Sequence, residues 1–230
     1  LVERVAGRVP LLMGCGGNST AAVVNELQSF DWKGIDGILS VCPYYNKPSQ
    51  EGLYQHYRAL AQASPLPIVL YNVPGRAGVP IPVDTIVKLS SHPLMVAVKE
   101  AGGSVDRVSA IKDLCGDDIT VLSGDDSLTL PMMSVGATGI ISVASNIIPG
   151  EMSEMVAAFL AGDVAKAQAI HAKYYAFFRD QFQYERHTET ALASSHTGTR
   201  SALNAINISC GGIAANCLNH LTFADGFTTA

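Results

Sequence analysis

Met95-Val-Ala-Val-Lys99 is the stretch that decides the fold class, because it is a short, nearly continuous apolar run that ends in a charged residue. This pattern is typical of a strand covered on both faces, whereas a strand with one face in solvent alternates apolar and polar side chains. Five further runs have the same character: residues 9–14, 37–41, 67–72, 119–123 and 139–143. The sequence therefore predicts six buried strands.

Helix-like stretches separate these runs. They are residues 20–29, 50–63, 82–90, 104–114 and 128–135, with two more at 150–161 and 165–183 after the last run. Such repetition indicates an α/β fold with a parallel sheet, either open or closed into a barrel. Polar or reactive residues end nearly every strand, which favours a barrel because its strand ends meet around one mouth. Six strands are fewer than the eight of a (β/α)8 TIM barrel, so we expect an incomplete barrel or an open sheet.

The composition is that of a globular chain. Of 230 residues, 48% are hydrophobic and 15% are charged, and the net charge is −5. A large core is expected, without the basic surface that binds nucleic acid and without a membrane span. The five cysteines form no Cys-x-x-Cys pair, which predicts neither a disulfide framework nor a thiolate zinc site. A cytoplasmic protein is the simplest interpretation.

Lys99 is unusual because it ends a strand that is expected to be buried. Burying an ammonium group without a partner is costly, so desolvation favours the neutral amine. A neutral amine can attack a ketone and form an imine, which then acts as an electron sink. The local sequence also allows two simpler interpretations: an amine that reaches solvent, or one that pairs with Glu100.

Two more polar side chains follow the strand expected at residues 67–72. Tyr71 ends that strand, where a phenol can relay a proton, although a packed core tyrosine is the commoner case. Arg76 lies in the tight segment Pro74-Gly-Arg-Ala-Gly78, and a guanidinium can bind a carboxylate through two hydrogen bonds. A solvated loop arginine is the simpler alternative.

Residues 14–20 form a glycine-rich loop between a strand and a helix, where an anion could bind. The loop lacks both the full Gly-x-Gly-x-x-Gly pattern and the Gly-Lys-Ser/Thr of a phosphate loop. Asp125 and Asp126 follow another strand, but no third metal ligand accompanies them. We interpret the two aspartates as structural or hydrogen-bonding groups and predict no metal site.

Five strand-end motifs occur in a fixed order along the chain. They are Pro43-Tyr-Tyr-Asn-Lys-Pro-Ser-Gln-Glu-Gly-Leu-Tyr-Gln-His56, Leu70-Tyr-Asn-Val-Pro-Gly-Arg-Ala-Gly78, Val98-Lys-Glu-Ala101, Leu122-Ser-Gly-Asp-Asp126 and Gly139-Ile-Ile-Ser-Val-Ala-Ser-Asn146. Together they resemble the dihydrodipicolinate synthase family, over about residues 9–183. Their order and spacing make this resemblance far more specific than any one motif.

The resemblance implies a (β/α)8 barrel and a lyase of lysine and diaminopimelate biosynthesis. Such an enzyme condenses pyruvate with L-aspartate-4-semialdehyde to give 4-hydroxy-tetrahydrodipicolinate, and no metal or organic cofactor is implied. Lys99 would form the Schiff base with pyruvate. Tyr71 would relay protons, and Arg76 would bind the carboxylate of the semialdehyde.

Further residues acquire roles from the same resemblance. Tyr45 matches the tyrosine that family members insert across a tight dimer interface into the partner's site. The main chain of Ile141 would line the pyruvate pocket, and Gly124 would lie near the semialdehyde pocket. A homotetramer built from two tight dimers is implied.

The sequence departs from the family at both ends. The family's opening segment, which carries two strands and a threonine of the proton relay, is not matched, so we expect an incomplete barrel at residues 1–183. Residues 184–230 are rich in Ser, Thr, Asn and Ala and lack Lys, Val and Pro. We predict an atypical tail there, derived from a frameshift or a joined foreign segment; a single clean reading frame shared with related sequences would contradict that origin.

Other functions stay open at this point. Sister families such as N-acetylneuraminate lyase and the 2-keto-3-deoxy sugar acid aldolases share the lysine and the barrel, but the Gly75–Arg76 pair favours the synthase. A truncated, non-catalytic remnant is a different class of answer. An anion-binding module that uses residues 14–20 is another.

Feedback by lysine is expected to be weak or absent. Asn18 and Tyr44 match positions that bind the inhibitor at the dimer interface of regulated members, but Ala22 stands where those members commonly carry a glutamate. Without that carboxylate the inhibitor's amine loses a charge-assisted hydrogen bond. An activity assay with and without lysine, on a chain that also carries the family's opening segment, tests this; strong inhibition would contradict it.

Overall fold

A curved parallel sheet forms the centre of the computed structural model, which describes residues 1–183 and 212–213. Its six parallel strands lie side by side in chain order. They are β1 (Leu12–Gly14), β2 (Gly37–Val41), β3 (Ile68–Asn72), β4 (Met95–Glu100), β5 (Thr120–Ser123) and β6 (Gly139–Ser142). A two-residue strand, β7 (Gly212–Ile213), pairs antiparallel with β6. All six predicted strands are confirmed.

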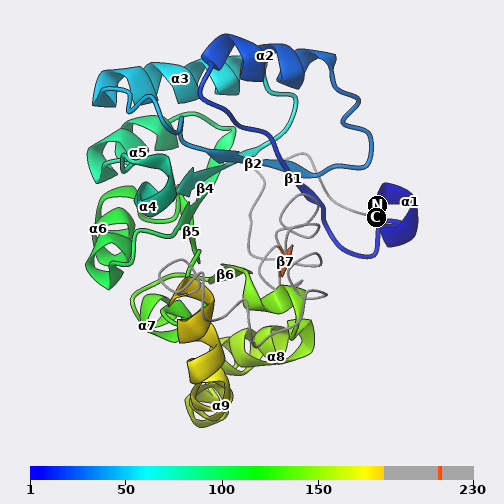
Figure 1. Ribbon diagram of the computed structural model, residues 1–230, viewed down its shortest axis with the longest axis vertical. Helices are drawn as coiled ribbons and strands as arrows, with labels where there is room; N and C mark the ends of the chain where they lie inside the picture. Colours follow the sequence, from blue (N-terminus) through cyan, green and yellow to red (C-terminus); the bar gives the residue numbers. More distant parts are fainter. Residues whose placement is uncertain (184–211, 214–230) are drawn as a thin grey trace.

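Helices follow the strands and lie along the outer side of the sheet (Figure 1). They are α2 (Thr20–Ser29), α3 (Gln50–Ala63), α5 (Val83–Ser90), α6 (Val105–Cys115), α7 (Thr129–Ser134), α8 (Pro149–Leu160) and α9 (Val164–Gln183). Three short elements escaped the sequence analysis: α1 (Val2–Val5), α4 (Pro74–Ala77) and the 3-10 helix η1 (Ala144–Asn146). Each spans too few residues to show a helical period.

The strand order distinguishes between the two α/β architectures that the sequence allowed. A doubly wound sheet reverses its strand order at a switch point and carries helices on both faces. Here the order β1-β2-β3-β4-β5-β6 does not reverse, and the helices curve around one side (Figure 1). The fold is therefore an incomplete (β/α)8 barrel, as predicted.

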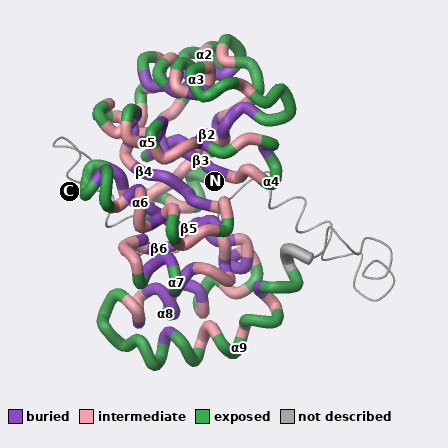
Figure 2. The backbone as a smooth tube through the Cα atoms, turned by 90° about the vertical axis from the view of Figure 1, so that its left-hand side faces the viewer, coloured by how far each residue is buried: buried purple, intermediate pink, exposed green. Residues whose placement is uncertain are grey.

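The main core lies between the sheet and the helices. Burial follows the strands and the inward-facing sides of the helices, while their outward sides are exposed (Figure 2). Large side chains that are fully buried include Leu27, Ile38, Leu53, Tyr57, Leu60, Ile68, Ile86, Ile111 and Phe178. Burying each such side chain contributes about 1.5–3 kcal/mol, so this layer accounts for much of the folding free energy.

Serine caps start three of the helices, α2, α3 and α6. The Ser49 hydroxyl accepts a hydrogen bond from the Gly52 amide at 3.1 Å, and Ser104 accepts one from the Arg107 amide at 3.3 Å. Each cap satisfies an amide of the first turn that has no partner within its helix. The caps fix where α3 and α6 begin after the loops that follow β2 and β4.

Some predictions concern residues outside the described part. Most of the predicted tail, residues 184–211 and 214–230, lies outside the described residues. The division into residues 1–183 and 184–230 therefore stays a prediction. Across the described residues, no helix combines the length and apolarity needed to cross a membrane.

Replacing Leu53 with Ala should destabilise the fold by about 2–5 kcal/mol, because the lost methyl groups leave a cavity between α3 and the sheet. Leu53 is fully buried, whereas Leu114 on α6 is 56% exposed. Leu114→Ala is the matched control and should change stability by less than about 0.5 kcal/mol. Urea unfolding measures both; equal losses would contradict this account of the core.

Candidate active site

Lys99 and Tyr71 meet at the carboxyl ends of neighbouring strands. The register of β3 and β4 places Tyr71 directly opposite Lys99. The two side chains point to the same face of the sheet, and Lys99 Nζ lies 4.2 Å from the centroid of the Tyr71 ring. A cation over an aromatic face is attracted by the ring's electrons. The amine and the phenol, which the sequence placed at the ends of two different strands, are therefore neighbours in the fold.

Lys99 neither reaches solvent nor pairs with its neighbour Glu100. The lysine is only 7% exposed, and Glu100 forms its ion pair with Arg107, at 3.2 Å. The reason is strand geometry, since consecutive side chains point to opposite faces. Both simpler interpretations of this lysine are therefore wrong.

Burial lowers the pKa of Lys99 from 10.5 to about 8, and the negative charge of Asp126 partly opposes that shift. Desolvation disfavours the ammonium form, while a nearby carboxylate favours it. A lysine with this pKa carries an appreciable fraction of neutral amine near neutral pH. That fraction is the nucleophilic form needed for attack on a carbonyl.

Asp126 organises the chain beyond β6. Its buried carboxylate accepts hydrogen bonds from the Ser142 hydroxyl and from the amides of Val143 and Ala144, at 3.2 and 3.0 Å. Asp125 instead accepts bonds from the amide and hydroxyl of Ser127. The interpretation of both aspartates as hydrogen-bonding groups is confirmed. The electrostatic effect of Asp126 on Lys99 was missed, because nothing local in the sequence reveals which strand end faces which.

A side chain at Gly124 would crowd both Ala101 and the stem of Lys99. A Cβ atom at Gly124 would lie 2.7 Å from the Ala101 Cβ and 3.1 Å from the Cγ and Cε of Lys99. Contacts below 3.0 Å force the backbone or a neighbour to move. The glycine thus allows the lysine stem to lie flat against the end of β5.

A cavity of about 370 Å³ opens on the inner side of the sheet. It is lined by Gly14, Cys15, Gly16, Leu39, Val41, Tyr71, Val73 and Arg76. Tyr71 and Arg76 therefore share one cavity, and Lys99 lies beside it against the Tyr71 ring. Burial raises the pKa of the Tyr71 phenol, and the positive charge of Arg76 opposes that rise.

The glycine-rich loop at residues 14–20 contributes wall to this cavity. Gly14 and Gly16 line it, and a Cβ at Gly16 would lie 3.1 Å from both the main-chain N and the side chain of Val41. Cys15, within the same loop, also lines the cavity. Within the described residues, no group of three or more His, Cys, Asp or Glu side chains is placed to hold a metal ion.

The remaining predicted residues belong to other parts of the fold. Tyr45 is 88% exposed and has a positive φ of 73°, a strained conformation for a residue with a side chain. Tyr44 is also exposed, and the Asn18 carbonyl accepts a hydrogen bond from Asn46. Ile141 is buried on β6 and pairs with β7.

Comparison with known protein families gives a match for the chain that carries this site. Residues 1–199 match the Dihydrodipicolinate synthetase family.

The chain belongs to this family.

One relative is 4-hydroxy-tetrahydrodipicolinate synthase 1 of Halalkalibacterium halodurans, 46% identical over 193 residues, or 84% of this chain and 65% of that protein. The chain thus spans less than two thirds of that relative's length. The crystal structure of dihydrodipicolinate synthase from Aquifex aeolicus has a TM-score of 0.77 and 39% identity, over 97% of this chain and 69% of that one. The chloride-inhibited dihydrodipicolinate synthase from Acinetobacter baumannii, complexed with pyruvate, has a TM-score of 0.77 and 34% identity, over 97% and 78%.

The match of the dihydrodipicolinate synthetase family confirms the resemblance drawn from the five motifs. It also reaches beyond residues 9–183, because it starts at residue 1 and continues to residue 199. Its last part falls within the stretch expected to be an atypical tail.

The reactivity of Lys99 toward trace acetic anhydride should rise with pH and reach half its maximum near pH 8, since only the unprotonated amine reacts. In the urea-unfolded chain the midpoint should return toward 10.5. Competitive labelling followed by mass spectrometry of the Lys99 peptide measures both curves.

Asp126→Asn should move the folded-state midpoint below that of the parent chain, because the substitution removes the charge that favours the ammonium form. Asp125→Asn is the matched control and should leave the midpoint in place. A midpoint that rises or stays unchanged in Asp126→Asn would contradict the electrostatic role of Asp126.

Proposed function

We propose that this chain carries the Schiff-base site of a 4-hydroxy-tetrahydrodipicolinate synthase, a lyase of lysine and diaminopimelate biosynthesis. In this reaction pyruvate condenses with L-aspartate-4-semialdehyde. The observation that carries the proposal is the buried Lys99 amine, 4.2 Å from the centre of the Tyr71 ring. The names of the relatives and the pyruvate held by the Acinetobacter baumannii enzyme support the choice of substrates.

The first half of the reaction takes place on pyruvate. The neutral amine of Lys99 attacks the ketone carbon, and loss of water leaves an imine between Nζ and that carbon. Loss of a proton from the methyl group then gives an enamine, because the iminium nitrogen accepts the electron pair. The Tyr71 phenol lies beside Nζ with a raised pKa, so it stays protonated at neutral pH and can pass protons to and from the reacting atoms.

The second half joins the two substrates. The enamine carbon attacks the aldehyde carbon, and the amine of the semialdehyde then displaces Lys99 while the ring closes. Arg76 lines the same cavity as Tyr71. Its planar guanidinium suits a carboxylate, and it is the group that we assign to the semialdehyde.

The other roles that the family suggests are part of the same proposal. Gly124, against the Lys99 stem, and the main chain of Ile141 would border the substrates. Tyr45 would act in a partner subunit of a homotetramer built from tight dimers, and its exposure and positive φ support that role. Asn18 and Tyr44 would face an inhibitor at the same interface. A cytoplasmic location and the absence of an organic cofactor complete the proposal.

Incubation with pyruvate and borohydride should leave a reduced pyruvate adduct on Lys99, because reduction fixes the imine. Lys99→Arg keeps the charge but should give no adduct, since a guanidinium does not form this imine. Tyr71→Phe should slow adduct formation by about 10²-fold or more. Mass spectrometry of the digested protein locates and quantifies the adduct.

Tyr174→Phe is the matched control for the phenol. Tyr174 donates a hydrogen bond to Glu151, between α9 and α8, so this variant should form the adduct at the parent rate. A folded parent chain that forms no adduct would contradict the proposed function and favour a non-catalytic remnant. In a separate assay without borohydride, condensation of pyruvate with a sugar aldehyde in place of the semialdehyde would favour a sister aldolase.

A further inference from the structure

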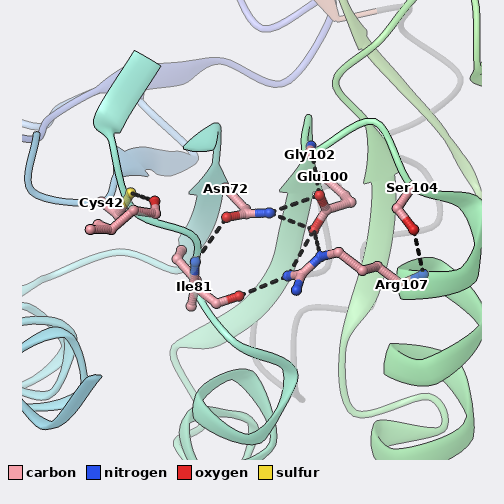
Figure 3. A network of polar contacts seen from close by, with 8 residues as sticks. Cys42, Asn72, Ile81, Glu100, Gly102, Ser104 and Arg107 are labelled. Carbon is pink, nitrogen blue, oxygen red and sulfur yellow. Dashed lines mark hydrogen bonds and ion pairs between the residues drawn. The ribbon is translucent and has the colours of Figure 1, made fainter. Parts of the chain in front are cut away.

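The ends of β3 and β4 carry two different pairs of side chains on their two faces. Tyr71 lies opposite Lys99, and one residue further on Asn72 lies opposite Glu100. Because side chains alternate along a strand, the first pair faces the site and the second faces the layer behind it. Lys99 and Tyr71 are thus each one residue away from a member of a buried polar network. Figure 3 shows that network around Asn72, Glu100 and Arg107.

Glu100 is the centre of that network and is fully buried. Its two carboxylate oxygens accept bonds from Asn72 Nδ2 at 2.7 and 2.9 Å, and Oε1 accepts one from the Gly102 amide at 2.7 Å. Arg107 Nε and Nη2, on α6, donate to Oε2 at 3.3 and 3.2 Å. A buried carboxylate with this many donors has a single favourable position, because any displacement leaves a charge unsatisfied.

Gly102 makes the close approach to this carboxylate possible. A Cβ atom there would lie 2.6 Å from Glu100 Oε1 and 3.2 Å from Asn72 Nδ2. The main chain after β4 can therefore donate its amide directly to the carboxylate. The network is built from a strand pair, the following loop and the first turn of α6.

The same network also holds the loop that carries Arg76. The Ile81 amide donates to Asn72 Oδ1 at 2.9 Å, and the Ile81 carbonyl accepts a bond from Arg107 Nη2 at 2.7 Å. Both main-chain polar groups of this buried residue are thus bound by the network (Figure 3). The segment at residues 73–80, which includes α4 and Arg76, leaves β3 at Asn72 and returns to the Asn72 side chain at Ile81.

We propose that Asn72, Glu100 and Arg107 are positioning residues that fix the Arg76 loop relative to the strand bearing Lys99. This inference rests on the proposed function, which assigns Lys99 to pyruvate and Arg76 to the carboxylate of the second substrate. No side chain of the network needs to touch either substrate. The network sets the distance between Lys99 and Arg76. If the loop moves and this distance changes, binding of the second substrate weakens more than attack of Lys99 on pyruvate does.

Arg107→Lys is the most specific test of the network. Lysine keeps a positive charge beside Glu100, but its single ammonium group cannot reproduce the fork that reaches both Glu100 and the Ile81 carbonyl. Arg179→Lys is the matched control, because Arg179 pairs with Asp180 on the exposed side of α9. Glu100→Gln is the second variant, which keeps the shape of the side chain and removes its charge.

The first measurement is amide hydrogen exchange of the peptide covering residues 73–82, on the full chain without substrate. We expect exchange to become about tenfold faster in Arg107→Lys, because the loop loses the hydrogen bond to Ile81. The parent chain and Arg179→Lys should exchange alike. Unchanged exchange in both Arg107→Lys and Glu100→Gln would overturn the proposal, whatever the chain's activity is.

The second measurement separates the two substrates. Arg107→Lys should raise the KM for L-aspartate-4-semialdehyde by about tenfold while the rate of borohydride-trapped pyruvate adduct on Lys99 stays within about twofold of the parent. If Arg107→Lys slowed adduct formation by the same factor as it raised the KM, the network would have a merely structural role and the proposal would be overturned. A parent chain that forms no adduct would instead overturn the proposed function, and the exchange measurement would still decide whether the network holds the loop.

Discussion

The site depends on one constraint: β4 buries Lys99 and Glu100, which are adjacent in sequence and differ in charge, on its two different faces. If Lys99 and Glu100 paired with each other, the carboxylate would hold the amine in its ammonium form. The strand instead directs Glu100 to Arg107 and leaves Lys99 against the Tyr71 ring. The Glu100 carboxylate is neutralised on the helix-covered face of the sheet, and the Lys99 amine is desolvated on the opposite face.

The curvature of the sheet turns these strand ends into a site. Parallel strands in chain order place their carboxyl ends at one edge, so groups far apart in sequence share one cavity. The cavity is lined by Gly14 at the end of β1, Gly16 in the following loop, Tyr71 on β3 and Arg76 on α4. Asp126 joins β5 to the turn after β6 and adds the charge that opposes the shift at Lys99. In the proposed reaction, Lys99 and Tyr71 at the strand ends would carry out the chemistry, and Arg76 in the loop between β3 and α5 would bind the carboxylate.

Much of this arrangement could be predicted from the chain's local patterns. Continuous apolar runs identified all six strands of the barrel, and the helix-like stretches at residues 50–63 and 104–114 identified α3 and α6. The short elements α1, α4 and η1 were missed, because so few residues carry no period. The likeness of the strand-end motifs to one family was correct, since spacing along the chain reflects the spacing of strands in the barrel.

What only the tertiary structure decided is which partners the buried polar groups have. The sequence by itself determined that Lys99 and Tyr71 end buried strands and that polar groups gather at the strand ends. It left open whether Lys99 pairs with Glu100, and it gave no sign that Arg107 binds both Glu100 and the Ile81 carbonyl. The physical reason is the distance along the chain over which each kind of interaction acts. Periodicity and capping depend on neighbours along the chain, whereas a buried charge selects its partner from whatever strand register and helix packing bring within hydrogen-bonding distance.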